Sequence, residues 1–171
     1  MPDALDTLTN INLDDLIASF GWQENALLRG FTRWAFRQPA REFARQMLSF
    51  DLEVGQVGLA IAGLHMLRRY ARSLTVFGQE NIPSGPVLFL SNHPGMVDTL
   101  ALFSALDRSD LRVIAIDRPF LAALTNTSQY LDYLEDDPRS RIGLVRKVSA
   151  HLRSGGSVLT FPSGRIEPDP D

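Results

Sequence analysis

Short apolar runs that alternate with segments of helical period constrain the fold of this chain more than any other feature of its sequence. The runs are rich in β-favouring side chains and lie at residues 74–77, 87–90, 112–116, 129–134 and 157–161. Helical segments occupy 96–106, 119–126 and 142–153 between them. Strands separated by helices of about ten residues predict a mostly parallel sheet with right-handed crossovers. We therefore predict an α/β fold with helices flanking the sheet.

The first 73 residues predict helices alone, so the chain divides into a helical part over 1–73 and an α/β core over 74–171. The helical part is expected to cap the core or to associate with a membrane. Its first predicted helix spans 12–29, with Asn12 as the expected N-cap. One apolar face of this helix is formed by Leu13, Leu16, Ile17 and Phe20.

Two further features mark the helical part. Residues 27–45 carry arginines four residues apart with aromatic side chains between them, and Pro39 in the middle predicts two short helices instead of one. A third helix is predicted over 52–73, where three glycines allow a neighbouring element to approach closely: Gly55, Gly58 and Gly63.

Charge is unevenly distributed along these helices. Residues 1–21 hold four aspartates and no basic residue, whereas residues 22–73 hold eight arginines against four acidic residues. Arginines interleaved with aromatics are typical of segments that lie in a lipid headgroup layer, so a membrane surface is an expected partner. The alternative is a lid whose aromatics pack on the core and whose arginines are solvated. Nucleic acid is not an expected partner, because the net charge is −3 and no recognition motif occurs.

Composition excludes several other classes of protein. A length of 171 residues with 44% hydrophobic content fits one α/β core. The chain has no cysteine, and its three histidines lie far apart in sequence, so neither a disulfide framework nor a metal site is expected.

The expected location follows from two segments. The acidic start lacks the basic region of a secretory signal, which predicts a cytoplasmic protein, peripheral on the inner face of the cell membrane. The longest weakly polar run, residues 57–67, is too short to span a bilayer, so no transmembrane helix is expected.

A histidine and an aspartate follow the apolar run at 87–90. Pro94 and Gly95 predict a turn that can fold the imidazole of His93 back toward the carboxylate of Asp98. Such a carboxylate fixes the tautomer of the ring and leaves its other nitrogen as a general base. The carboxyl end of a strand is also where open α/β sheets bind ligands. The simpler alternative is a turn histidine beside an aspartate that complements a helix dipole.

The sequence resembles the glycerolipid acyltransferase family in two ordered motifs, Asn92-His93-Pro94-Gly95-Met96-Val97-Asp98 and Phe161-Pro162-Ser163-Gly164. That family, which includes glycerol-3-phosphate and lysophosphatidic acid acyltransferases, has a histidine and an aspartate separated by four residues after an apolar strand. It later has a Phe-Pro-Glu-Gly turn after another strand. The lead-in over 78–86 is also similar, and the resemblance covers roughly residues 74–167.

The resemblance implies an enzyme of phospholipid biosynthesis that moves a fatty acyl group from a thioester to a glycerophosphate or lysophospholipid hydroxyl. The donor would be acyl-CoA or acyl-carrier protein, with no bound cofactor and no metal. His93 would take the hydroxyl proton, Asp98 would orient His93, and the oxygen would attack the thioester without an acyl-enzyme. Asn92 and Gly95 would lie beside the substrate, and backbone amides after Pro94 would bind the oxyanion.

The second motif departs from the family. Ser163 replaces the glutamate, and Gly164 is followed by Arg165, Ile166 and Glu167 where the family has a Thr-Arg pair. Arg165 is expected to reach a phosphate, and Glu167 is expected to replace the missing carboxylate from a shifted position. Further candidates for phosphate binding between the motifs are Arg118, Arg139 and Arg141. Ser163 is not expected to be a hydrolase nucleophile, because the Gly-x-Ser-x-Gly frame is absent.

The sequence also stops soon after the second motif, where the family usually continues with a further strand. The α/β core over 74–171 is therefore expected to be incomplete at its C-terminus, with an unpaired sheet edge. This leaves an alternative function open, that of a truncated or catalytically impaired protein that binds phospholipid surfaces.

Overall fold

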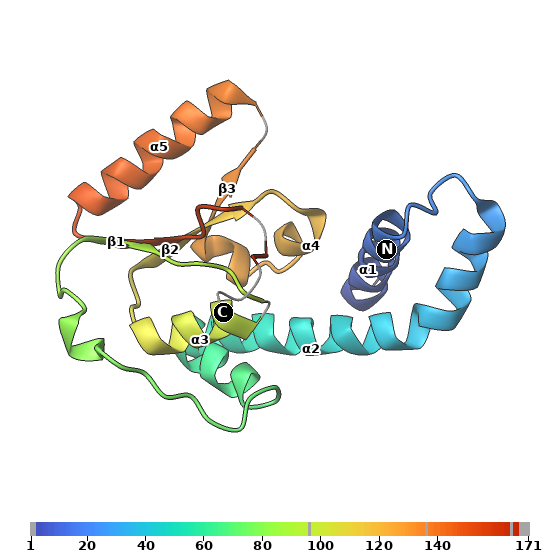
Figure 1. Cartoon of the computed structure of the whole chain (residues 1–171), viewed down its shortest axis with the longest axis horizontal. Coiled ribbons are helices and arrows are strands. Elements are labelled where there is room, and N and C mark those ends of the chain that lie inside the picture. The colour runs from blue at the N-terminus through green and yellow to red at the C-terminus, as the bar shows by residue number, and fades with distance from the viewer. Residues whose placement is uncertain (1–2, 96, 136, 165, 168–171) are drawn as a thin grey trace.

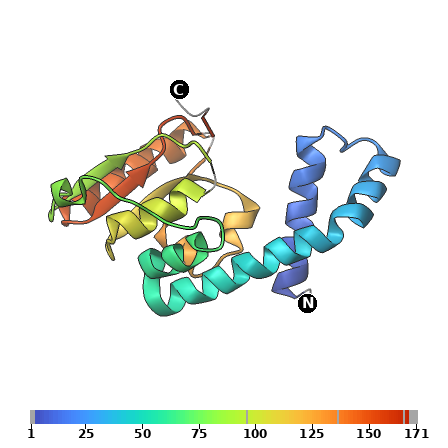
Figure 2. The same ribbon diagram turned by 60° about the horizontal axis from the view of Figure 1, so that its bottom comes forward.

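The computed structural model contains a four-stranded parallel sheet with helices on both faces, preceded by two long helices that form a hairpin (Figures 1 and 2). It describes residues 3–95, 97–135, 137–164 and 166–167. The strands are β1 (Val87–Leu90), β2 (Leu111–Ile116), β3 (Leu131–Leu134) and β4 (Ser157–Thr160). The predicted α/β fold class is confirmed.

The spatial order of the strands is β1-β4-β2-β3, and every neighbouring pair is parallel. In the β1–β4 pair Val87 lies opposite Ser157 and Leu90 lies opposite Thr160. Parallel strands end at the same edge of a sheet, so the residues that follow β1, β2, β3 and β4 all meet at one side, here called the carboxyl edge.

One face of the sheet is covered by the second half of α2 (Ala26–Leu67) and by α3 (Val97–Leu106) (Figure 1). Helix α3 supplies Phe103 to this core. The buried side chains come from α2 and the strands and include Phe50, Val54, Leu59, Ala62, Met66, Leu111, Val113, Leu131 and Leu159. A single hydrophobic core therefore joins the second half of α2 to the sheet.

Helix α2 differs from the two helices predicted on either side of Pro39 and the separate third helix. It runs through Pro39 without a break. Figure 1 shows it bending in its light-blue first half, as expected where a proline removes one backbone hydrogen bond. The true interruption lies at Gly58, whose backbone has φ 80° and ψ 172°. This conformation favours glycine, so Gly58 kinks the helix instead of allowing a close approach.

The other two glycines of this segment do admit neighbours, as predicted. A Cβ atom at Gly63 would lie 3.0 Å from Cβ of Phe103 in α3. A Cβ atom at Gly55 would lie 2.6 Å from Oδ1 of Asn126. Next to Gly55, the buried carboxylate of Asp51 accepts hydrogen bonds from the backbone and side-chain amides of Asn126 and from the backbone amide of Thr127. These contacts attach α2 to the segment before β3.

Helix α1 (Ala4–Ser19) begins earlier than predicted, with Asp3 and not Asn12 at its N-cap. Asn12 lies inside the helix and donates a hydrogen bond to the carbonyl of Ala40 in α2. The helix ends before Gly21, which has φ 68°, and α2 then begins after its own N-cap, Asn25. A second small core of Leu8, Ala44 and Leu124 holds the hairpin against the segment after β2.

Helix α2 is, within the described residues, the helix whose length and composition would allow it to cross a membrane. The core helix of a globular domain passes the same test. In this chain Phe50, Val54, Leu59 and Met66 of α2 are already buried against the sheet.

Three predicted elements, at 74–77, 119–126 and 129–134, are shorter than predicted or absent. Residues 74–77 form no strand and lie exposed between α2 and the short 3-10 helix Gln79–Asn81. The helix predicted over 119–126 is reduced to α4 (Pro119–Ala122), and a 3-10 turn, Thr127–Tyr130, occupies the predicted start of β3. Pro119 at the start of α4 supports the first helical turn but not the rest.

Helix α5 (Pro138–Arg153) covers part of the opposite face of the sheet, and none of its described residues is fully buried. An ion-pair network holds it there. Asp132 of β3, 2% exposed, accepts hydrogen bonds from Arg112 of β2 and lies 2.7 Å from Nζ of Lys147 of α5. Burial by itself would raise the pKa of Asp132, but the hydrogen bonds from Arg112 and Lys147 outweigh burial and lower it.

We predict that Asp132→Asn lowers the free energy of unfolding at pH 7 by about 2 kcal/mol, because two cations lose their carboxylate. The folded pKa lies below the unfolded value, so the stabilisation is complete above the unfolded pKa of about 4 and is lost as the pH falls through the folded pKa. Urea unfolding of both proteins from pH 7 to pH 3 should show the difference shrinking below about pH 4. A difference in unfolding free energy that stays constant over this pH range would contradict the lowered pKa of Asp132.

Candidate active site

The imidazole of His93 and the carboxylate of Asp98 are in contact at the carboxyl edge. His93 follows β1, Asp98 lies in the first turn of α3, and Nδ1 of His93 is 2.9 Å from Oδ2 of Asp98. Their side chains are 23% and 15% exposed, so solvent reaches the ring but the carboxylate is mostly covered. The turn at Pro94 and Gly95 brings the two side chains together, as the sequence predicted.

The surroundings of Asp98 fix the orientation of the pair. The backbone amide of Gly95 donates to Oδ2 of Asp98 at 3.2 Å, and the amide of Thr99 donates to Oδ1 at 2.6 Å. Both oxygens of this carboxylate accept hydrogen bonds from backbone amides, and an ionised carboxylate acts only as an acceptor. Nδ1 of His93 is therefore the protonated nitrogen, and Nε2 is left as the basic one.

The second motif supports the ring of His93 from another part of the chain. Phe161 follows β4, the neighbour of β1, and its ring stacks on the imidazole with centroids 4.5 Å apart and planes 28° apart. The motif then turns back, since the amide of Gly164 donates to the carbonyl of Phe161 and Gly164 has φ 62°. Strand pairing thus brings together two motifs that lie far apart in sequence.

Glu167 holds the backbone of His93 at two points. The amide of His93 donates to Oε2 of Glu167 at 3.1 Å, and the amide of Glu167 donates to the carbonyl of His93 at 2.7 Å. The side chain of Glu167 therefore faces the turn that carries the histidine. It was expected to replace the missing glutamate of the second motif, and the structure shows it as a residue that positions His93.

The other residues predicted around the substrate are placed as follows. Asn92 is exposed directly before His93, and Gly95 uses its amide to hold Asp98. Ser163 and Gly164 lie in the turn after β4, next to the His93 turn. Arg165 lies outside the described residues.

The three arginines proposed for phosphate binding follow strands further along the sheet. Arg118 comes after β2, two strands from β1, and Arg139 and Arg141 lie in the first turn of α5 after β3, three strands away. With strands about 4.8 Å apart, these positions lie roughly 10 Å and 14 Å across the edge from β1. All three are exposed, and Arg118 is the one whose side chain has the shorter distance to cover toward His93.

Two contacts of the site were not identified from the sequence. Phe161 was noted as part of a motif, but its ring contact with His93 depends on the β1–β4 pairing. The hydrogen bond from the amide of Thr99 to Asp98 is a local contact between neighbouring residues in the first turn of α3. Within the described residues, no group of three or more His, Asp and Glu side chains is arranged to hold a metal ion.

Comparison with protein families places this site in a known class. A family model described as Acyltransferase matches residues 73–169, more than half of the chain and all four strands. The chain therefore belongs to the glycerolipid acyltransferase family, as its two motifs predicted. Neither the curated proteins nor the solved structures contain a significant match.

We predict that Glu167→Ala exposes the amide of His93 to hydrogen exchange. A hydrogen bond to a charged acceptor stabilises by about 1.5 kcal/mol, so exchange at His93 should become roughly tenfold faster. Glu167→Gln is the matched control, because its amide oxygen still accepts, and its effect should be smaller.

The amide of Ser91 provides an internal reference, since it donates to the carbonyl of Thr160 and should exchange as before. Unchanged exchange at His93 in Glu167→Ala would show that this carboxylate does not hold the turn.

Proposed function

We propose that this protein transfers a fatty acyl group from a thioester to the hydroxyl of a glycerophosphate or a lysophospholipid, within phospholipid biosynthesis. Membership of the acyltransferase family supports acyl transfer in general. The observation that carries the proposal is the 2.9 Å contact between Nδ1 of His93 and Asp98, which leaves a basic nitrogen at a partly exposed sheet edge.

In the proposed reaction, Nε2 of His93 takes the proton of the acceptor hydroxyl as its oxygen attacks the thioester carbonyl. The thiolate then leaves with a proton, so His93 returns to its neutral form. Asp98 stabilises the imidazolium that forms between these steps, as a buried carboxylate does in other histidine-based catalysts. Phe161 and Glu167 keep the ring and its backbone in position.

The carbonyl oxygen needs hydrogen-bond donors when it becomes negative. Gly95 and Thr99 already donate their amides to Asp98, so they are not available for this task. The described amides left at the start of α3 are those of Val97 and Asp98, and we assign the oxyanion to this helix start.

The acceptor phosphate needs a cationic partner at the same edge. Arg118 is our first choice, because it is exposed and follows the strand two places from β1. Arg139 and Arg141 are more distant alternatives. The donor is acyl-CoA or acyl-carrier protein, with no resident cofactor.

We predict that His93→Ala lowers the rate of acyl transfer by about a hundredfold or more, the usual contribution of a general base. The assay follows release of free thiol from acyl-CoA in the presence of glycerol-3-phosphate or lysophosphatidic acid. Asp98→Asn should also lower the rate, since the imidazolium loses its counter-charge.

His65→Ala is a matched control for the loss of a histidine. His65 is half-exposed on α2, where it pairs with Glu53. This variant should keep the wild-type rate. Thiol release that depends on no acceptor, or full activity in His93→Ala, would contradict acyl transfer at this site and favour a phospholipid-binding protein without catalysis.

We also propose that the protein works on the cytoplasmic face of the cell membrane, attached by the tip of its helical hairpin. The hairpin tip comprises the exposed apolar residues Phe20, Leu27, Phe31 and Trp34, of which Leu27 is 85% and Trp34 is 79% exposed. The transfer of such apolar side chains from water into a headgroup layer is energetically favourable.

The arginines of the hairpin contribute less free charge than their number suggests. Arg33 pairs with Asp14 and Arg41 pairs with Asp6, both across to α1, and Arg45 pairs with Glu42. Arg29 and Arg37 are exposed and form no ion pair among the described residues. Attachment at the hairpin tip therefore depends mainly on its apolar side chains.

We predict that Leu27→Ser combined with Trp34→Ser weakens binding to phospholipid vesicles at least tenfold, because two large apolar side chains no longer enter the headgroup layer. Co-sedimentation with vesicles measures the change. Ile142→Ser with Val145→Ser on α5 is the matched control, since these side chains are 56% and 63% exposed. Equal losses in both variants would contradict attachment by the hairpin tip.

A further inference from the structure

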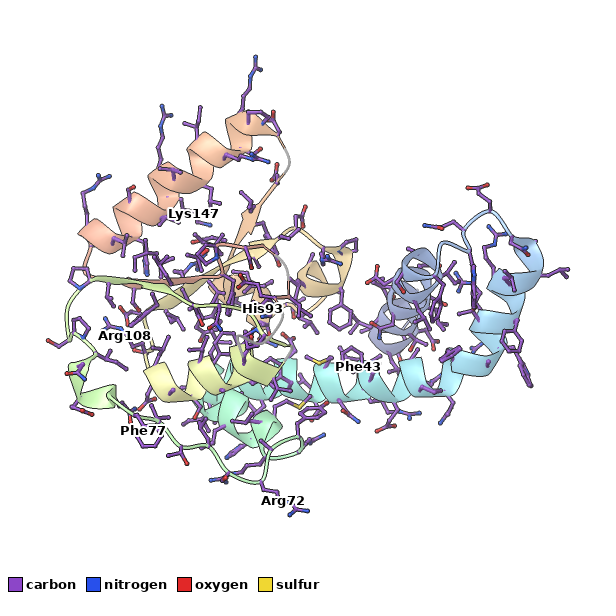
Figure 3. All side chains as sticks on the ribbon, viewed as in Figure 1. Phe43, Arg72, Phe77, His93, Arg108 and Lys147 are labelled. Carbon is purple, nitrogen blue, oxygen red and sulfur yellow. The ribbon has the colours of Figure 1, made fainter. Side chains whose placement is uncertain are left out.

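The segment that connects α2 to the sheet carries an exposed cationic and apolar surface that acyl transfer at His93 does not use. This linker surface comprises Arg68, Arg69, Tyr70, Arg72, Leu74, Val76 and Phe77, all of which are exposed. Phe77 is 91% exposed, more than any other large hydrophobic residue among the described ones. Figure 3 shows Phe77 and Arg72 projecting from the lower margin of the molecule, away from the sheet.

The sequence predicted a strand at 74–77, which would have buried every second side chain. In the structure this segment pairs with no strand. The backbone amides of residues 72–78 donate no hydrogen bond to a backbone carbonyl of the described residues. Leu74 and Val76 are each 38% exposed and Tyr70 is 51% exposed. Apolar side chains held on an extended segment outside the core are typical of an interaction surface.

The charge of the linker surface has one sign. The sequence has no acidic residue between Glu53 and Glu80, whereas Arg68, Arg69 and Arg72 fall within that stretch. None of these three arginines forms an ion pair with another described residue. They differ in this respect from Arg33 and Arg41 of the hairpin, and their charge is available to an anionic partner.

We propose that the linker surface is a second membrane contact, which binds anionic phospholipid through Arg68, Arg69 and Arg72 and inserts Phe77 between the headgroups. A layer of anionic headgroups over an apolar interior matches this combination of free arginines and an exposed aromatic ring. The unpaired backbone keeps the segment at headgroup depth, because unsatisfied amides are costly in the hydrocarbon.

A second contact changes how strongly the protein is held. A single apolar anchor gives marginal, reversible membrane binding, and a basic patch added to it gives stable attachment. Two contacts on one chain act together, since binding of the first raises the effective concentration of the second. The linker surface is thus a contact additional to the hairpin tip. Its residues take no part in acyl transfer and do not belong to the hairpin tip.

The test compares two double variants with the same change in net charge on vesicles of phosphatidylglycerol and phosphatidylcholine. Arg69→Glu with Arg72→Glu should weaken binding at least tenfold, whereas Arg146→Glu with Arg153→Glu on the exposed face of α5 should weaken it less than threefold. Circular dichroism checks that both variants are folded. Equal losses would show a general charge effect and would overturn the proposal.

A fluorescence probe tests insertion directly. Phe77→Trp is introduced into a chain carrying Trp22→Phe and Trp34→Phe, so that position 77 holds its sole tryptophan. Its emission should shift to the blue on anionic vesicles and be quenched by brominated lipid, and neither change should occur with a DNA oligonucleotide. An unshifted emission, or the same shift with DNA, would overturn lipid insertion.

The outcomes separate this proposal from the proposed function. Thiol release from acyl-CoA in detergent micelles should be unchanged in Arg69→Glu with Arg72→Glu. Activity without any effect of the linker variants on vesicle binding would leave acyl transfer standing and reject the linker surface. Vesicle binding that depends on the linker surface, with no thiol release from the wild-type protein, would support the linker surface and reject acyl transfer.

Discussion

The pairing of β1 with β4 is the contact on which the candidate site depends. It places the turn after Leu90 beside the turn after Thr160, so that the ring of Phe161 stacks on His93 and Glu167 binds the backbone of the same residue. Asp98 holds the ring from the first turn of α3. The histidine is therefore fixed by contacts from two separate segments, the start of α3 and the stretch after β4. A base that must act in one orientation needs this degree of restraint, because small displacements of a catalytic group cost much of its effect.

Glu167 shows how the chain holds its site without the family's glutamate in the second motif. Ser163 stands at the motif position, and the carboxylate appears four residues later, where it accepts from the amide of His93. It positions the turn that carries His93, and as an anion it would repel a phosphate, so the acceptor phosphate of the proposed reaction needs a cationic partner elsewhere at the carboxyl edge. Arginines at the carboxyl edge are the available cations, and the parallel order of the strands ranks Arg118 ahead of Arg139 and Arg141.

Helices α1 and α2 are attached to the core, and they leave two exposed surfaces, the hairpin tip and the linker surface that follows α2. The second half of α2 is part of the sheet's core, which holds the hairpin in a defined direction relative to His93. The hairpin tip and the linker surface both leave large apolar side chains outside, while Arg33 and Arg41 between them form ion pairs with aspartates of α1. This division fits the membrane attachment proposed above, in which the core stays folded in water and the two exposed ends would contact the bilayer surface.

The sequence by itself determined the α/β class, the approximate places of four strands, the family, and the contact between His93 and Asp98, because these depend on local periodicity and on a turn of two residues. It could not determine elements whose state depends on distant partners. Pro39 stays inside a helix because neighbouring contacts outweigh one lost hydrogen bond, and residues 74–77 remain unpaired because no strand lies beside them. Only the tertiary structure joined the acidic α1 to the basic α2, placed Phe161 and Glu167 against His93, and left Arg68, Arg69 and Arg72 without acidic partners among the described residues. Each of these results from packing between segments far apart in sequence, which no local pattern records.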